Sequence, residues 1–484
     1  MDYETIIGLE VHAQLLTKSK MYCRCSADYA AAPPNTHVCP VCLGMPGVLP
    51  VINEQAIEYT IMTALALNCT ISDYTKFDRK NYPYPDLMKG YQISQYDTPI
   101  SHDGWFIIEV DGKEKRVGIT RVHLEEDVAK LLHRTAADGQ SYSLVDVNRA
   151  GVPLMEIVGE PDLRSPEEAR QYLIKLRSIL QYLGVSTGNM EEGSFRCDAN
   201  ISIRPSSSPK SLAKVEVKNM NSFKAVYLAL EYEAKRQRKM ADEGKKLAQE
   251  TRGWVEAKGA TVAQRSKEYA HDYRYFPEPD LPPLVLSRER VGEIRSKLPE
   301  LPEARRERFV DEYKLPAYDA SLLTGAKAMA DYFEECWRVN EKVSPKEVSN
   351  WLLGEASRIT NEQNIDIDEF RERVSPEHLS GLILSSHSTI NIATAKSVLE
   401  EMFRTGQSAE EIIKQRGLSQ ISDTKQLEEV VIEVINSNAQ AVADYKGGKK
   451  ESLKFLVGQV MRATRGRANP ALVNELLEKK LEEG

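Results

Sequence analysis

Three segments of the sequence place charged or imidazole side chains at alternate positions of otherwise apolar, strand-like stretches. The segments are IGLEVHAQL, TRVHLEEDVAK and DVNRAGVPLMEIVGEPD, and their polar residues are Glu10, His12, Gln14, Arg121, His123, Glu125, Asp127, Asp146, Asn148, Arg149 and Glu156. Successive side chains of a strand point to opposite faces, so in the first two segments these groups share one face. Each face alone could simply be solvated. Three together favour an oxygen-rich cation site, and carboxylates with one imidazole and water suit Mg²⁺.

A site that handles phosphate also needs cations. Residues 76–97, KFDRKNYPYPDLMKGYQISQYD, supply four of them among tyrosines: Lys76, Arg79, Lys80 and Lys89. This mixture suits nucleotide stacking and phosphate neutralisation, although a solvated loop around a tyrosine core would have the same composition. Further charged residues lie in GNMEEGSFRCDANISIR and HDYRYFPEPD, namely Glu191, Glu192, Arg196, Asp198 and Arg274.

Four of the seven cysteines lie between residues 21 and 47, in MYCRCSADYAAAPPNTHVCPVCLGMPG. Their spacing, C-x-C followed after thirteen residues by C-x-x-C, is close to that of four-thiolate zinc sites. The ligands would be Cys23, Cys25, Cys39 and Cys42. Such a zinc is structural, because four thiolates leave no open coordination position. The alternatives are reduced cysteines without metal, or a site in which His37 replaces one thiol. The remaining cysteines, Cys69, Cys197 and Cys336, are expected to be buried as small apolar residues.

The sequence lacks the signatures of several common enzyme classes. It has no G-x-x-x-x-G-K-[ST] phosphate loop, no G-x-G-x-x-G dinucleotide fingerprint, and no H-R-D with D-F-G as in protein kinases. From residue types and spacing alone, we therefore expect a metal-dependent enzyme of unspecified reaction.

The composition indicates an ordinary globular protein. The chain has 484 residues, a formal net charge of −8 at pH 7, and 41% hydrophobic and 28% charged residues, which suggests several domains. The net charge argues against binding nucleic acid over the whole surface but allows a local basic patch. The first residues do not resemble a signal peptide, and no run of about eighteen apolar residues occurs. We therefore expect a cytoplasmic protein with reduced thiols and no membrane contact.

The elements that position these residues form an α+β pattern. Up to about residue 290, stretches such as WFIIEV, KRVGITRVHLE, ANISIR and KVEVK predict a mostly antiparallel sheet. A helix is predicted after Ser165, with Pro166 at its first position, Glu168 closing a capping box, and Gly184 ending it in the left-handed conformation. Residues 276–284, FPEPDLPPL, predict an extended linker that closes this region.

Beyond the linker, strand signals nearly vanish and helix starts recur at Ser344, Ser375, Ser408 and Asn469. The fold class is therefore a large, mostly antiparallel-sheet domain followed by two small all-α domains, with a break near RTGQS at residues 404–408. The expected boundaries are 1–293, including the cysteine loop at 21–47, then 294–407 and 408–484.

The last of these domains carries a basic stretch. Residues 446–467, KGGKKESLKFLVGQVMRATRGR, hold several lysines and arginines and a single acidic residue. Such a surface can attract RNA locally although the whole chain is acidic. We expect Arg462, Arg465 and Arg467 to contact RNA phosphates or loops. The alternative is a solvated basic helix end that complements its own dipole.

Taken together, these motifs resemble the B subunit of the tRNA-dependent amidotransferases, which convert Glu-tRNA(Gln) to Gln-tRNA(Gln) or Asp-tRNA(Asn) to Asn-tRNA(Asn). The resemblance runs nearly end to end, through IGLEVHAQL, FDRKNYPYPDLMKGYQISQYD, RVHLEEDVAK, LVDVNRAGVPLMEIVGEPD, MEEGSFRCDANIS, DYRYFPEPDLPPL and FLVGQVMRATRGRANPALV. Some members of this family lack the cysteine quartet, so we expect zinc to be an option that this chain uses and not a requirement of the chemistry.

The resemblance implies a catalytic domain called a cradle, a helical domain, and a helical tail that touches tRNA. It implies that ATP phosphorylates the side-chain carboxylate of the misacylated aminoacyl group, and that ammonia then attacks the acyl phosphate. The ammonia would come through a tunnel from an amidase, the A subunit, in a heterotrimer with a small C subunit. The implied cofactors are ATP, magnesium and structural zinc.

The resemblance also carries roles onto residues of this chain. The magnesium site falls on His12, Glu125 and Glu156, with Glu10 in the same cluster. Lys80 and Lys89 are expected near phosphate or at the tunnel mouth, and Arg79, Lys80, Asp127 and Asp198 as cofactor-binding groups. The alternative hypothesis is a noncatalytic subunit that binds tRNA and assembles the complex, with all chemistry in its partner.

Overall fold

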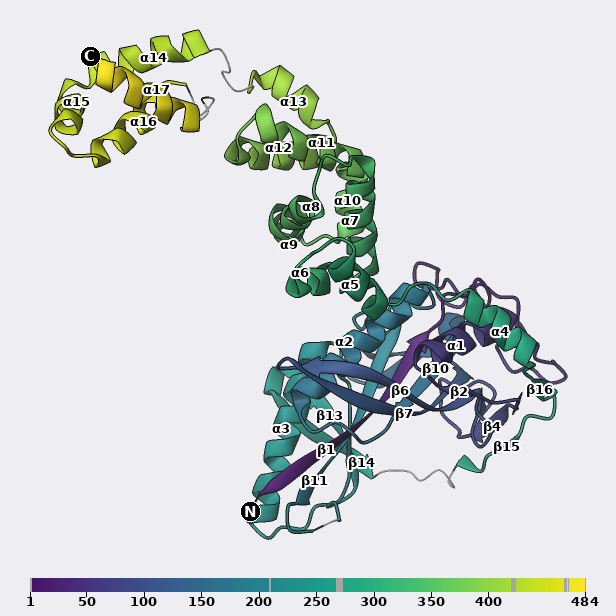
Figure 1. The fold of residues 1–484 in the computed structure, drawn as a ribbon. Coiled ribbons are helices and arrows are strands. Elements are labelled where there is room, and N and C mark those ends of the chain that lie inside the picture. The colour runs from purple at the N-terminus through teal and green to yellow at the C-terminus, as the bar shows by residue number, and fades with distance from the viewer. Residues whose placement is uncertain are drawn as a thin grey trace. The chain divides into compact units, whose positions relative to one another are not determined.

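The alternating polar and apolar residues near the N-terminus form the centre of a large sheet (Figure 1). The computed structural model describes residues 2–208, 210–266, 273–418, 424–464, 468 and 470–483. The chain divides into two compact units, Met1–Pro302 and Glu303–Gly484. The first unit contains the sheet and the second consists of helices, which confirms the expected α+β fold.

Within the described residues, the main sheet has nine strands in the order β14-β13-β12-β11-β1-β10-β7-β6-β2. Their bounds are β1 Tyr3–Gln14, β2 Thr70–Ile71, β6 Ser101–Val110, β7 Lys113–Glu126, β10 Pro153–Gly159, β11 Phe195–Pro205, β12 Val215–Lys218, β13 Glu250–Val255 and β14 Ala260–Ser266. Every neighbouring pair is antiparallel except β12 with β13. The sheet is therefore mostly antiparallel, as predicted.

One face of this sheet is covered by three helices, α1 (Glu54–Ala66), α2 (Pro166–Leu183) and α3 (Phe223–Asp242). The alternate residues Leu9, Val11 and Ala13 of β1 are fully buried in the core that these helices share with the sheet. The intervening residues of β1 therefore lie on the opposite face, which these helices leave open.

Helix α2 begins and ends as its sequence predicts. The Ser165 side chain accepts a hydrogen bond from the Glu168 N–H, and Gly184 has φ +67°. The predicted capping box is altered, because the Glu168 carboxylate accepts from the main-chain N–H of Arg164, one residue before the cap. Its buried stripe is formed by Leu173, Leu176, Leu180 and Leu183.

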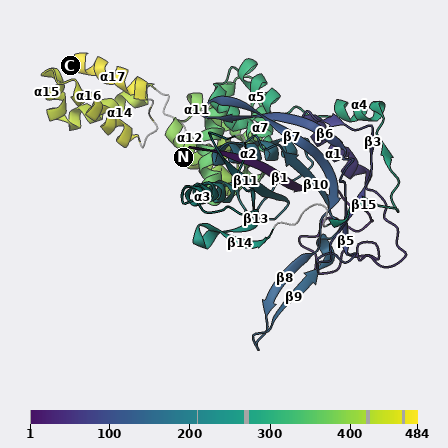
Figure 2. The same ribbon diagram turned by 90° about the horizontal axis from the view of Figure 1, so that it is seen from below.

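The first unit also contains smaller sheets. They are formed by β3 (Tyr74–Thr75) with β16 (Leu284–Val285), by β15 (Phe276–Pro277), β4 (Asp78–Asn81) and β5 (Tyr91–Ser94), and by the hairpin of β8 (Lys130–Thr135) and β9 (Ser141–Asp146). The hairpin extends from the body of the unit (Figure 2). The proline-rich stretch at 276–284 is thus more than a linker, because both of its ends pair with strands. Proline tolerates such edge positions since it lacks an N–H.

Helix α4 (Arg288–Ser296) packs against α1 and completes the first unit. The second unit contains two separate hydrophobic clusters in its described residues, one from Phe309 to Ile413 and one from Leu427 to Leu481. The helices of the first cluster are α5 Pro302–Asp311, α6 Ala317–Thr324, α7 Lys327–Val339, α8 Pro345–Trp351, α9 Ser357–Gln363, α10 Ile367–Arg373, α11 Pro376–Ser388, α12 Ile392–Thr405 and α13 Ala409–Arg416. Those of the second are α14 Thr424–Ser437, α15 Ala439–Lys446, α16 Glu451–Ala463 and α17 Pro470–Glu483.

The helix starts at Ser344, Ser375 and Ser408 are confirmed, since each side chain accepts a hydrogen bond from the N–H three residues later. The fourth, Asn469, lies outside the described residues. Among the described residues, no helix is long and apolar enough to cross a membrane.

Candidate active site

The register of the main sheet brings distant polar residues into one row. His12 of β1 lies directly opposite Glu156 of β10 on one side and Arg196 of β11 on the other. Glu156 in turn lies opposite His123 of β7. Side chains at directly opposed positions of antiparallel strands are close neighbours, so this row follows from the pairing itself. Glu125 joins it from the next position along the same face of β7.

His12, Glu125 and Glu156 converge at the centre of this row. The His12 Nε2 atom lies 3.5 Å from Glu125 Oε1 and 3.5 Å from Glu156 Oε2. One ligand atom from each residue lies within 4.8 Å of the other two, a separation that allows all three to hold one ion. Glu125 is buried and the other two are partly buried, so the group lies at the floor of the open face.

The pKa values of His12 and Glu156 depend on the opposite charges of the imidazoles and carboxylates around them. Burial alone would lower the pKa of His12, but the charges of Glu156 and Glu125 and a hydrogen bond to Glu156 raise it to about 9. Burial would raise the pKa of Glu156, but the imidazoles of His123 and His12 bring it well below its ordinary value. The carboxylate of Glu156 is therefore ionised, as a cation ligand must be.

Glu10 lies on the same face of β1 but outside this three-residue group. Its opposite residues are Val158 on β10 and Asp198 on β11, so it belongs to the next row of the sheet. Its Oε1 atom accepts a hydrogen bond of 2.7 Å from Asn200 Nδ2. The sequence shows that Glu10 and His12 share a face of β1. Which residues of the neighbouring strands lie opposite each of them depends on how the strands pair.

Asp127 is buried just beyond the end of β7 and acts as a junction for three strands. Its carboxylate accepts hydrogen bonds from both terminal nitrogens of Arg196, at 3.1 and 3.2 Å, and from Gln14 Nε2 at 2.7 Å. Burial would raise its pKa, but Arg196 and Arg149 lower it. Asp127 therefore holds Arg196 beside His12.

These residues line one cavity of about 450 Å³. The residues that line it are Glu10, His12, Lys80, Tyr82, Gln92, Tyr96, Arg121, Glu125, Asp127, Val128, Leu154, Glu156, Arg196, Asp198, Glu216, Lys218, Thr251, Tyr273 and Tyr275. On one side, Tyr96 and Tyr275 stack at 4.2 Å between ring centroids, and Lys80 lies over the Tyr273 ring at 4.9 Å. On the other, Lys218 donates to Asp198 at 2.6 Å.

Two of the basic residues expected near phosphate face a different cavity, of about 230 Å³. Arg79 donates two hydrogen bonds to Glu278 and one to Asp280, and Lys89 pairs with the buried Glu126. Because neighbouring strand residues point to opposite faces, Lys80 and Glu125 enter the larger cavity, whereas Arg79 and Glu126 enter the smaller one.

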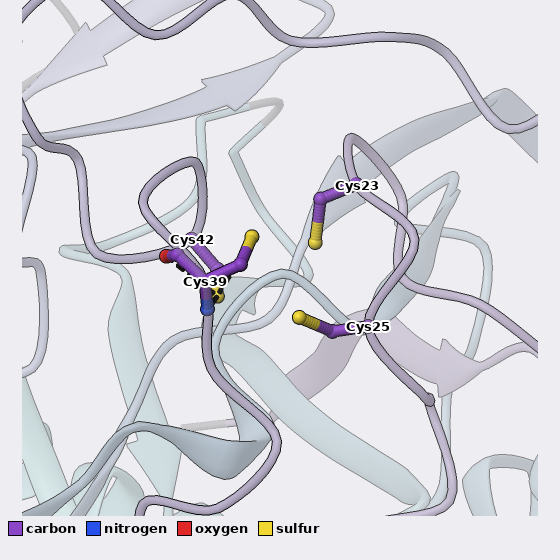
Figure 3. A group of neighbouring side chains, drawn as sticks. All are labelled: Cys23, Cys25, Cys39 and Cys42. Atoms are coloured by element: carbon purple, nitrogen blue, oxygen red, sulfur yellow. Dashed lines mark hydrogen bonds between the residues drawn. The ribbon is translucent and has the colours of Figure 1, made fainter.

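The four loop cysteines lie together, with their sulfurs directed toward one another (Figure 3). Sulfur atoms from all four lie within 4.8 Å of one another, and His37 is not part of this group. A hydrogen bond from Cys23 is the main reason that the pKa of Cys42 falls to about 5, and a main-chain hydrogen bond and the charge of Lys20 assist it. As expected, the other cysteines, Cys69, Cys197 and Cys336, are buried.

Two polar residues from the third charged segment hold this loop instead of joining the acidic group. Asp146 accepts from the Asn35 N–H at 3.1 Å, and Asn148 accepts from the His37 N–H at 2.8 Å. Of that segment, only Glu156 reaches His12.

In the tail, Arg462 lies exposed on α16, whereas Arg465 and Arg467 fall outside the described residues. Tyr96 lies in the segment 76–97 that suits stacking, but Lys218 and Glu216 from β12 and Tyr275, which stacks on Tyr96, were not predicted. The alternation in KVEVK indicated a polar face, but nothing in it indicated which strand lies alongside.

The chain matches two family models. Residues 5–292 match the GatB/GatE catalytic domain, and residues 331–481 match the GatB domain. Similar curated proteins include the B subunit of the aspartyl/glutamyl-tRNA(Asn/Gln) amidotransferase of Dehalococcoides mccartyi (strain ATCC BAA-2266 / KCTC 15142 / 195), which is 63% identical over 100% of this chain and 99% of its own length. The proteins of the same name from Thermomicrobium roseum and Thermoanaerobacter pseudethanolicus are 57% and 55% identical. They cover 100% and 99% of this chain, and 99% and 100% of their own lengths.

The match to a catalytic domain covers the strands that carry His12, Glu125 and Glu156, and the full-length similarity extends through both helical clusters. The chain therefore belongs to the family of aspartyl/glutamyl-tRNA(Asn/Gln) amidotransferase B subunits, which are enzymes of protein biosynthesis.

Proposed function

We propose that this chain uses ATP to phosphorylate the side-chain carboxylate of Glu-tRNA(Gln), Asp-tRNA(Asn) or both, and then amidates it. In the first step a carboxylate oxygen bonds to the γ-phosphorus of ATP, and ADP leaves. In the second, ammonia forms the new C–N bond, and phosphate leaves as the C–O bond breaks and the nitrogen loses a proton. A free carboxylate resists attack by ammonia, whereas an acyl phosphate has a good leaving group.

The observation that carries this proposal is the convergence of His12, Glu125 and Glu156 at the floor of a cavity of about 450 Å³. Two carboxylates and one imidazole, with room for water, fit a Mg²⁺ ion, and these three residues would hold it. Bound there, the ion would neutralise phosphoryl charge. Glu10 and Asp198 lie in the next row and would act on the substrate or on water at the rim of the site.

Lys80 and the tyrosines supply the other half of a nucleotide site. Lys80 is the basic residue of β4 that enters this cavity, and the tyrosine rings around it offer flat apolar surfaces to a base. We propose that Lys80 neutralises phosphate there, and that Asp127 positions Arg196 beside His12. Arg79 is occupied by Glu278 and Asp280, so we propose a structural role for it. Lys89 lies in the smaller cavity. We therefore propose that it lies at the mouth of the ammonia tunnel and does not contact phosphate.

We also propose the partners and the second metal. None of the residues assigned above is a nucleophile able to hydrolyse glutamine, so ammonia would come from a separate amidase, held with this chain by a small third protein of the complex. The cysteine quartet would bind a structural zinc that contributes on the order of 10 kcal/mol to the folding of its loop. The basic residues of α16 would contact tRNA.

The test uses the assembled complex with charged tRNA, ATP and ammonium supplied directly. Glu125→Gln, Glu156→Gln and His12→Ala should each lower amide formation by about 10²-fold or more, because each removes a ligand from the ion site. Glutamine hydrolysis by the partner should largely persist. Glu114→Gln is the matched control, since Glu114 is an exposed carboxylate on the same strand as Glu125.

Normal amidation in all three variants would overturn the assignment. It would favour instead a protein that only binds tRNA and assembles the complex.

A further inference from the structure

Lys20 is a buried cation beside the cysteine quartet. The residue is 1% exposed, and its Nζ atom donates to the main-chain oxygens of His37 at 2.8 Å and Val147 at 3.4 Å. Among the residues that the structure describes, no carboxylate lies within ion-pair distance of this atom. Carbonyl oxygens orient an ammonium but do not neutralise it, and a buried charge without a counter-charge is strongly unfavourable.

The side chain of Lys20 lies close to Cys42 of the second pair of cysteines. A Cβ atom placed on Gly151 would lie 3.4 Å from Lys20 Cδ and 3.8 Å from Cys42 Cβ, so the two side chains flank the same point. The main-chain N–H of Lys20 also donates to the Cys25 oxygen at 3.0 Å. Lys20 therefore touches both halves of the loop, the first through its main chain and the second through its side chain.

We propose that Lys20 is the counter-charge of a four-thiolate zinc centre formed by Cys23, Cys25, Cys39 and Cys42. The inference rests on the zinc site proposed above. Four thiolates around one Zn²⁺ leave two net negative charges, which a partly buried loop must balance. The ammonium supplies one opposite charge from the side of the core. Lys20 is a positioning residue in this role, because it acts on the centre through charge and contacts no substrate.

Zinc release from the full-length chain tests the proposal. Lys20→Met keeps the length of the side chain and removes its charge, so release to a chromophoric chelator should become about 10- to 100-fold faster. Lys18→Met is the matched control, since Lys18 is an exposed lysine two residues away and its loss changes the net charge equally. Lys20→Arg keeps the charge and should release zinc at a rate near that of the parent.

A double-mutant cycle separates charge from the hydrogen bonds of Lys20. In a Cys25→His or Cys39→His background the centre loses one negative charge, so Lys20→Met should cost much less there. An equal cost in both backgrounds would show that Lys20 only braces His37 and Val147, and would overturn the proposal. Release from Lys20→Met at the parent rate would do the same.

The failure of the zinc site itself is recognised separately. A parent chain that holds no zinc after purification with zinc present would refute the site, whatever the Lys20 variants do. If Lys20→Met prevents zinc loading altogether, the Lys20→Arg variant distinguishes the two explanations. Zinc loading by Lys20→Arg would support the role of the positive charge, and absence of loading in this variant would overturn the proposal.

Discussion

Consecutive residues of β4 and of β7 place their charged side chains in two different cavities. On β7, Glu125 faces the large cavity and Glu126 the small one, where Lys89 pairs with it. The Lys89 and Glu126 side chains are 13% and 6% exposed, so this is a largely buried ion pair. Glu126 also accepts from the Ile93 N–H at 3.0 Å. Removal of either partner leaves a buried charge.

We therefore expect Lys89→Met to lower the free energy of unfolding of the first unit by about 3 kcal/mol. The double variant Lys89→Met with Glu126→Gln should recover much of this loss, because the remaining buried charge is then removed. Denaturant unfolding of both variants measures the difference. Lys130→Met, at an exposed position of β8, serves as the control. A double variant less stable than Lys89→Met alone would contradict this view of the pair.

The residues of the candidate site could be predicted only in part from the sequence. The period of two in IGLEVHAQL showed that Glu10 and His12 share a face, and the structure agrees. It could not show that His12 lies opposite Glu156 while Glu10 lies opposite Val158, because register depends on strand pairing over long distances in the chain. The separation of Lys80 from Lys89 also escaped prediction, because Lys89 lies in the turn before β5, whose path the residue pattern does not specify.

At the scale of elements, helices α5 and α7 are joined by a buried carboxylate. Glu334 of α7 accepts hydrogen bonds from Arg305 at 2.5 Å, from Arg308 at 2.8 Å and from the Tyr313 hydroxyl at 2.7 Å. Burial would raise its pKa, but these hydrogen bonds, first that of Arg308, lower it from 4.5 to about 2. The carboxylate thus stabilises the folded unit above pH 4.5, and this stabilisation disappears as the pH falls through about 2.

Glu334→Gln should therefore lower the stability of α5 and α7 by about 3 kcal/mol at neutral pH. The difference from the parent should shrink between pH 4.5 and about 2, where the parent carboxylate also becomes neutral. Hydrogen–deuterium exchange of the two helices measures both effects. Glu335→Gln, a neighbouring carboxylate that is 36% exposed and pairs with Arg371, should change exchange little. A Glu334→Gln effect that stays constant down to pH 2 would argue against the ionised carboxylate as its source.

The cysteine loop is an element with little core of its own. Its residues 27–36 are all exposed or partly buried, and hydrogen bonds to Gln14, Asp146 and Asn148 are among those that hold them. If zinc holds this loop, chelation should open it to proteases between Ser26 and His37, while the main sheet persists. Limited proteolysis with mass spectrometry, with and without chelator, measures this. Re-addition of zinc should restore protection, and a loop equally resistant in both conditions would argue against the metal.

At the scale of the whole molecule, composition and helix signals sufficed for the fold class and for the change from sheet to helices. The finer divisions depend on packing that local sequence does not reveal. The chain divides after Pro302 and not at the expected boundary of 293, because α4, which spans residue 293, packs on α1 of the sheet unit. Likewise, α13 follows the Gly-containing break at RTGQS, yet Ala409, Ile412 and Ile413 belong to the first helical cluster.

This packing defines where the tail can be removed without damage. A truncation at residue 410 would strip Ile412 and Ile413 from the first helical cluster, whereas one after Leu418 removes the second cluster whole. With tRNA binding assigned to α16, the chain ending at Leu418 should show a KM for tRNA raised about tenfold or more. Its rate at saturating tRNA should change little, because the cavity with His12 lies in the other unit. The salt dependence of tRNA binding should also weaken, by a slope of about one for each lost phosphate contact.

The double variant Lys454→Ala with Arg462→Ala, which replaces two exposed basic residues of α16, should reproduce part of this effect in the full chain. An unchanged KM and an unchanged salt slope in both variants would mean that tRNA is held entirely by the remaining parts of the complex.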